Sequence, residues 1–141
     1  MKNILKIIIA LLLFNFCTIK LLSQPGTLDQ TFGDHGIVFN DSFSPANACL
    51  ILKDGRILVA GRSKIGELLL WRFMPDGNLD ISFGLDGRSI YNVGDRLRQT
   101  YDMILQPDDK ILIVGENHPA FSHIDAGIIR FMQDGILDSS F

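Results

Sequence analysis

The 141-residue chain has little cysteine, little excess of either charge and no enzyme nucleophile motif, and each absence argues against a class of protein. Two Cys cannot build a disulfide-rich scaffold. With 13 basic and 16 acidic side chains, the chain offers no basic patch for nucleic-acid phosphates. It contains neither a Gly-x-Ser-x-Gly elbow nor a phosphate-binding glycine loop. The apolar fraction of 47% argues against a disordered chain.

The chain also lacks an apolar run long enough to cross a membrane. Eight successive apolar residues start at Ile7, after two lysines, and an extension to Ile19 gives only 13, whereas a spanning helix needs about 20. This pattern predicts a signal-peptide helix over residues 1–23 with cleavage after Ser23, and therefore an exported protein with no stable membrane span after cleavage. A lipoprotein anchor at Cys17 and an uncleaved membrane anchor are the alternatives.

The chain beyond this leader is repetitive. Three blocks occur in the same order in two units: Gly-x-Leu-Asp at 26–33 and 77–84, Asp-x-(Lys/Arg)-Ile-Leu at 52–61 and 106–115, and Arg-Phe-Met at 72–77 and 130–135. The first block starts again at 135 and reaches Phe141. We therefore expect one repeat over 25–76, a second over 77–134, and the start of a truncated third over 135–141. A period near 50 residues is typical of propellers.

Each unit contains four strand candidates separated by turn residues. They cover 36–41, 46–52, 56–62 and 67–74 in the first unit, and 88–93, 101–106, 110–116 and 126–132 in the second. Tight hairpins are expected at Asp54-Gly55 and Asp108-Asp109. Four of these strands are apolar at successive positions, at 49–52, 57–60, 68–71 and 111–114, so both of their sheet faces need cover. The pattern predicts an all-β chain with propeller-like blades of four antiparallel strands.

Two repeats do not close a propeller, which takes about 4–8 blades. We expect about two blades of an incomplete propeller, with the remaining blades in a longer parent chain or in an oligomer. Trp71, Phe73 and Phe131 are predicted core residues. Cys49 is predicted to be a small buried apolar residue.

The spacing Gly-x-Leu-Asp-x-(Ser/Thr)-Phe-Gly-x-x-Gly at 26–36 and 77–87 resembles the delta-60 repeat, as does the Ile-Leu block at 52–61 and 105–115. The resemblance covers essentially all of residues 25–141. It implies a tandem β-propeller of undefined function in a secreted or surface bacterial protein, in some proteins exported onward by a type IX sorting domain. The sequence departs from the pattern at His35 and Asp109.

The residues expected to maintain the repeat are Leu, Asp, Phe and Gly at recurring positions. They are Leu28, Asp29, Phe32, Gly33, Gly36, Gly55, Gly61, Gly77, Leu79, Asp80, Phe83, Gly84, Gly87, Gly115, Gly135, Leu137, Asp138 and Phe141. The aspartates recur once per repeat, whereas an active site is normally unique. We therefore interpret them as structural hydrogen-bond acceptors and predict no catalytic residue.

The sequence predicts no metal site and no cofactor. His118, His123 and Asp125 are the candidate metal ligands, but two histidines four residues apart outside a helix do not define a zinc site, so a solvated loop is expected. Arg96 and Arg98 form the only local basic spot.

We expect a non-catalytic binding or scaffolding module at the cell surface or outside the cell, for an unknown protein or glycan ligand. The alternative is a fragment of a secreted hydrolase whose catalytic site is absent from this chain. A third interpretation is a non-functional truncation product.

Overall fold

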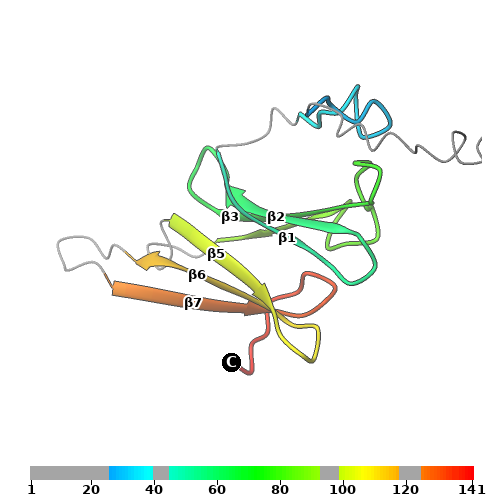
Figure 1. The fold of residues 1–141 in the computed structure, drawn as a ribbon. Coiled ribbons are helices and arrows are strands. Elements are labelled where there is room, and N and C mark those ends of the chain that lie inside the picture. The colour runs from blue at the N-terminus through cyan, green and yellow to red at the C-terminus, as the bar shows by residue number, and fades with distance from the viewer. Residues whose placement is uncertain (1–25, 40–44, 93–98, 118–124) are drawn as a thin grey trace, which may run out of the picture.

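The computed structural model of the chain describes residues 26–39, 45–92, 99–117 and 125–141 (Figure 1). These residues form seven strands in two antiparallel sheets, which confirms the prediction of an all-β chain with propeller-like blades. The predicted signal-peptide helix over 1–23 lies outside the described residues. Within the described ranges, no helix is long and apolar enough to cross a membrane.

The first sheet has four strands in the order in which they follow one another in the chain. They are β1 (Ala46–Ile51), β2 (Ile57–Arg62), β3 (Leu68–Phe73) and β4 (Arg88–Tyr91). Neighbouring strands are antiparallel, and the register places Leu50 opposite Leu58 and Ala60 opposite Leu70. A bulge between Ala46 and Ala48 interrupts the pairing of β1 with β2.

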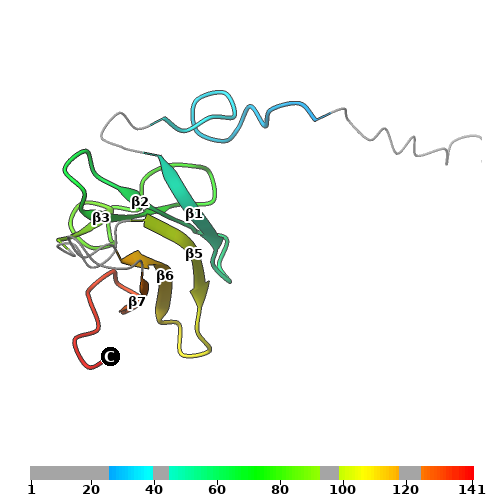
Figure 2. The same cartoon turned by 90° about the vertical axis from the view of Figure 1, so that its left-hand side faces the viewer.

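The second sheet repeats this arrangement with three strands. They are β5 (Gln99–Leu105), β6 (Ile111–Asn117) and β7 (Asp125–Phe131). The bulge recurs between Thr100 and Asp102. The two sheets stack face to face, as both views show (Figures 1 and 2). Among the described residues, no fourth strand pairs with the outer edge of β7.

The fourth strand of the first sheet comes from the second sequence repeat. Arg88–Tyr91 pairs with β3 rather than starting the sheet of β5 to β7. For the equivalent segment near the N-terminus, the sequence predicts a strand over 36–41, and this prediction is wrong for residues 36–39, which form only isolated bridges around Ile37. Its strand partner would belong to a unit preceding the first sheet, and no described strand occupies that place.

Both predicted hairpins form. Gly55 has a φ of 85° between β1 and β2, and Asp109 takes its place with a φ of 62° between β5 and β6. Each turn is closed by the same pair of backbone bonds, such as Leu52 N–H to Arg56 O at 2.8 Å and Gln106 N–H to Lys110 O at 2.8 Å. Aspartate tolerates the left-handed region moderately, so the turn survives without glycine.

The apolar core lies between the sheets. Leu58, Ala60 and Leu70 of the first sheet belong to one buried cluster with Met103, Ile111, Ile113 and Phe131 of the second. Phe83, from the connection between β3 and β4, is part of the same cluster. The core prediction is confirmed for Trp71 and Phe131, whereas Phe73 is half-buried.

The prediction that Cys49 is buried is wrong. Cys49 is exposed, although the equivalent Met103 of the second sheet is buried. Met103 faces the first sheet, whereas Cys49 lies on the face of the first sheet that points away from the second. At this strand position the neighbouring sheet decides burial, although Trp71 on the same outer face is buried.

Candidate functional site: carboxylate clusters and two surface hollows

The first carboxylate cluster is built around Asp80, just after β3. Its Oδ2 accepts hydrogen bonds from Arg72 Nε at 2.7 Å and from Arg56 Nη1 at 3.0 Å. Its Oδ1 accepts from the backbone N–H of Ser82 at 3.1 Å and from the Ser82 hydroxyl at 2.6 Å. The Asp80 and Arg72 side chains are only 7% and 6% exposed. A buried carboxylate is thus fully hydrogen-bonded.

The second sheet and the turn after it build the same cluster around Asp138. Arg130 Nε lies 2.8 Å from Asp138 Oδ2, and Lys110 Nζ lies 3.2 Å from it in the position equivalent to Arg56. The Ser140 hydroxyl donates to Oδ1 at 2.6 Å. Lysine and arginine therefore fill the same role in the two repeats.

Asp29, the third aspartate at this position of the repeat, is not paired with an arginine or lysine of the described residues. Asp29 accepts only local bonds, from the backbone N–H of Thr31 at 2.9 Å and from its hydroxyl at 2.6 Å, and it is exposed. The loop motif thus forms without a cation. In the other two clusters, one cation comes from β3 or β7 and one from the residue just before β2 or β6.

The hydrogen bonds control the ionisation of these carboxyls. Burial raises the pKa of Asp80, but bonds from Ser82, Arg56 and Arg72 outweigh it and hold the pKa well below its usual value. Hydrogen bonds from Ser140, with Lys110 and Arg130, likewise hold the pKa of Asp138 well below its usual value, against the effect of burial. Both groups are therefore charged at neutral pH and cannot act as general acids there.

Each cluster is also linked to its repeat phenylalanine, and Arg72 links the first blade to the second. The Arg72 guanidinium lies 4.7 Å from the centre of the Phe83 ring, and that of Arg130 lies 4.4 Å from the Phe141 ring. Arg72 Nη1 also donates to the carbonyl of Gln133, in the turn after β7, at 3.0 Å. Both clusters therefore fix the connection after β3 or β7, and the Asp80 cluster also joins the two sheets.

The other residues expected to maintain the repeat lie mostly in turns. Glycines with a positive φ are Gly33, Gly36, Gly55, Gly77, Gly84, Gly87 and Gly135. Gly61 and Gly115 lie at equivalent positions of β2 and β6. The leucines Leu79 and Leu137 form single bridges to Phe73 and Phe131, whereas Leu28 is exposed. Of the three phenylalanines, Phe83 is buried, Phe32 is half-buried and Phe141 is exposed.

The candidate metal ligands are not brought together by the described structure. Asp125 is an exposed residue at the start of β7, and His118 and His123 lie outside the described residues, as do Arg96 and Arg98. In the described part of the chain, no group of three His, Cys, Asp or Glu side chains could hold a metal ion. His35 is exposed and contacts Asp34 at 2.6 Å.

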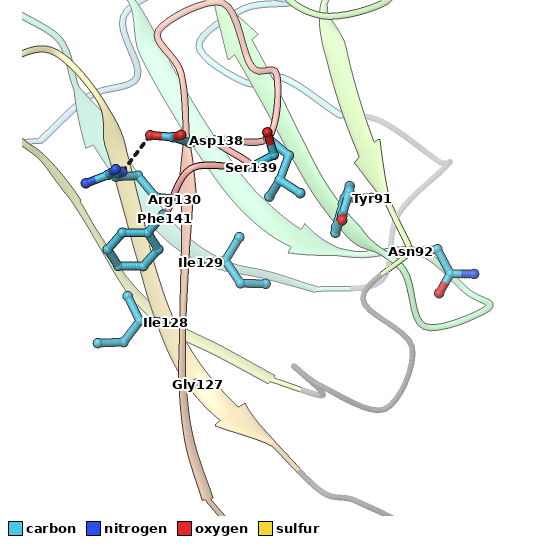
Figure 3. Close-up of a pocket in the computed structure, with 10 residues that line it drawn as sticks. Tyr91, Asn92, Gly127, Ile128, Ile129, Arg130, Asp138, Ser139 and Phe141 are labelled. Atoms are coloured by element: carbon cyan, nitrogen blue, oxygen red, sulfur yellow. Dashed lines mark hydrogen bonds and ion pairs between the residues drawn. The ribbon is translucent and has the colours of Figure 1, made fainter.

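An open groove of about 590 Å³ follows the outer edge of β7. Ile128 and Phe141 lie on one side of this strand, and Ile129 and Tyr91 lie on the other (Figure 3). The Arg130–Asp138 ion pair closes one end of the groove (Figure 3). The groove therefore combines apolar side chains with a strand edge.

A smaller polar hollow of about 370 Å³ lies at the loop end of the sheets. It is lined by the hairpin between β2 and β3, which contributes Arg62 and Lys64, and by Asn47 and Gln99 at the starts of β1 and β5. Arg62 Nη2 donates to the carbonyl of Gly66 at 2.9 Å, which fixes its guanidinium against the hairpin.

A family model described as a domain of unknown function (DUF5122) beta-propeller matches residues 52–83 and 106–141. The chain carries β-propeller-like repeats. Each match starts at the hairpin before β2 or β6 and ends at the repeat phenylalanine, so both contain the carboxylate cluster. Neither among curated proteins nor among solved structures was a significant match found.

The β-propeller-like repeats made the aspartates visible in the sequence, but not the cations that hold them. Arg72 and Arg130 precede their aspartates by eight residues, and both lie in the repeated Arg-Phe-Met block. Their recurrence was the available signal. The groove and the polar hollow had no comparable signal, because both depend on how the sheets end.

Proposed function

We propose that the protein is an exported delta-60-type module of β-propeller-like repeats, which binds or scaffolds a protein or glycan outside the cell or at its surface without catalysing a reaction. The supporting observation is that the repeated charged side chains bond to one another and to turns inside the blades. Asp80 accepts four hydrogen bonds, from Arg56, Arg72 and Ser82, and Arg72 is bound to Asp80, Ser82 and Gln133. These charged groups stabilise turns. We therefore assign ligand binding to the surface hollows.

The polar hollow is the proposed ligand-binding end. It lies beside the hairpin at 63–66, where the first repeat has a short connection and the second has a longer one over 117–125. Connections that differ between repeats are where repeat proteins place binding specificity. Arg62, Lys64 and Gln99 supply donors for the hydroxyl groups of a glycan or for the carbonyl groups of a protein.

The binding test is a glycan and protein array probed with the full chain. We expect at least one ligand whose signal falls when Lys64 and Gln99 are both changed to Ala. The matched control is Ile81→Ala, since Ile81 is also exposed but lies outside the hollow. An array without a ligand, or a ligand that binds the double variant unchanged, would contradict the proposal.

Export is tested separately by expressing the full sequence in a bacterial host. The expected product lies outside the cytoplasm and has lost the first 23 residues, which the mass of the intact protein shows directly. A cytoplasmic product that retains its N-terminus would overturn the export part of the proposal and leave the binding part standing.

A further inference from the structure

In each sheet the outer face corresponds, by the repeat, to the inner face of the other sheet. The two inner faces already pack against each other. The first sheet covers the second with Leu58, Ala60 and Leu70. The equivalent side chains of the second sheet are Leu112, Val114 and Ile128, which lie opposite to its buried Ile113 face. The second sheet therefore presents outward the kind of surface that the first sheet uses for packing.

The exposure of these equivalent residues differs sharply. Leu70 is 0% exposed and Ile128 is 57% exposed, and the same contrast separates Phe83 at 0% from Phe141 at 60%. Val114 and Ile104 are exposed on this face too. The exposed residues Ile104, Val114, Ile128 and Phe141 thus belong to the second sheet and the turn after it. The inner face of the first sheet is covered by the second sheet, whereas no sheet formed by the described residues covers the outer face of the second.

The outer face of the first sheet corresponds, residue by residue, to the inner face of the second sheet. The second sheet packs against the first through Met103, Leu105 and Ile113. The equivalent residues of the first sheet are Cys49, Ile51 and Val59. On this face Cys49 is exposed and Ile51 is 70% exposed, whereas Trp71, the equivalent of Ile129, is already buried. Each chain thus has one face of each kind, and the two kinds fit each other within the chain.

The segment Gly33–Phe39 has the backbone of the segment that leads into β4. Its φ angles at 33, 35 and 36 are 55°, 54° and 92°, against 54°, 51° and 84° at 84, 86 and 87. Gly33 N–H donates to Asp76 O at 2.8 Å, as Gly84 N–H donates to Asp134 O at 2.9 Å. The segment lies on the side of the first sheet away from the second (Figures 1 and 2). It therefore occupies the place of the last strand of a preceding blade.

We propose that a second copy of this chain docks head to tail on the outer face of the second sheet. Its first sheet covers Val114, Ile128 and Phe141, and its segment Ile37–Phe39 pairs with β7 as the missing fourth strand. Transfer of the register between β3 and β4 places Val38 opposite Ile128, the copies of Ser89 and Leu70. This fills the groove with a strand, the mode of association known as β-augmentation.

In this arrangement two equivalent segments compete for the place after β7. They are residues 26–32 of the incoming copy and residues 135–141 of the first copy, and only one of them can occupy it. Residues 135–141 already hold it, because Asp138 is paired with Arg130 and Lys110. Asp29 has no cation partner among the described residues. We expect residues 26–32 to move aside on association while Gly33–Phe39 keeps its place.

Head-to-tail contacts of this kind give a ring if the rotation closes and a filament if it does not. With the two sheets that the described residues form, a ring of a few copies would reach the blade number of a propeller. The association involves the strand edge and the apolar faces and does not need the proposed ligand, so it is tested on the purified chain alone.

The first test is the mass in solution of the full chain, purified as the cell processes it, measured by light scattering over a range of concentrations. We expect a multiple of the single-chain mass. Ile128→Lys should weaken association at least about tenfold, because it places a charge in the apolar contact. Ile65→Lys is the matched control, since Ile65 is exposed in the hairpin between β2 and β3 and touches neither outer face. Circular dichroism checks that both variants are folded.

The second test fixes the register by cross-linking. Val38→Cys and Ile128→Cys are placed in separate chains that carry Ser at positions 17 and 49, and the chains are mixed and oxidised. We expect a disulfide-linked pair, and none when Ile65→Cys replaces Ile128→Cys. A single-chain mass at every concentration, an assembly insensitive to Ile128→Lys, or equal cross-linking of both mixtures would each overturn the proposal.

Discussion

The substitution Asp80→Asn removes one charge from the buried cluster while it keeps the shape of the side chain. Asp29→Asn makes the same change at the equivalent position of the N-terminal segment. Asp80 has two cationic partners and is 7% exposed, whereas Asp29 is exposed and pairs, among the described residues, only with Thr31. The pair of variants therefore separates the contribution of the buried ion pairs from that of the turn motif.

The expected loss for Asp80→Asn follows from the state in which it leaves Arg72. The Arg72 side chain is 6% exposed, and removal of one partner of a buried ion pair costs about 3–5 kcal/mol. Arg72 keeps the Gln133 carbonyl, the Ser82 hydroxyl and the Phe83 ring, so we expect the lower end of this range, about 3 kcal/mol. Asp29→Asn is expected to change the stability little.

The assay is urea unfolding at one fixed protein concentration, followed by the fluorescence of Trp71, the only tryptophan and a buried one. A decrease of the free energy of unfolding for Asp80→Asn that equals the decrease for Asp29→Asn would refute the reasoning. So would a double variant with Leu at both 72 and 80 that is less stable than Asp80→Asn. An apolar pair of similar volume leaves no buried charge and should recover part of the loss.

Three further predictions use the same assay. Phe83→Ala should cost about 3–5 kcal/mol because it empties the core between the sheets, and Phe141→Ala should cost the single chain little; equal losses would contradict this. Gly84→Ala should cost about 2–4 kcal/mol, because its Cβ would lie 2.2 Å from Arg88 O at a φ of 54°, while Gly26→Ala, with free space, should be neutral. The lowered pKa of both cluster carboxyls means that their stabilisation is complete above their ordinary pKa of 3.8 and is lost as the pH falls from there. Unfolding free energies measured against pH should thus drop below about pH 4, and a flat profile would be the contrary result.

The parts of the fold that the sequence predicted are those with local causes. The hairpin at Gly55 needs a positive φ, and its counterpart Asp109 adopts the same backbone because aspartate tolerates this region. The strands follow from apolar runs between turn residues, and the Asp29 turn forms from its own threonine. In each case the residues that decide the structure are within a few positions of one another.

The parts that were missed depend on partners far away in the chain. Cys49 stands in an apolar strand like that of Met103, and only the position of the second sheet decides which of the two is buried. The ion pair of Arg72 with Asp80 needs the connection after β3 to fold back on the strand, which the spacing of eight residues does not reveal. The sequence alone therefore identified the aspartates without their cations.

The offset between the sequence repeat and the sheet follows from the connection after β3. A tandem repeat has no unique starting point, so its sequence is compatible with any division into blades. The first sheet takes Arg88–Tyr91 from beyond the Asp80 motif because that motif is anchored to Arg72 and turns the chain back along β3. The motif around Asp138 is anchored to Arg130 in the same way, so whichever strand completes the second sheet must meet β7 at that edge. The carboxylate cluster thus determines where each blade is completed, and the edge of β7 is where we propose that a second copy docks.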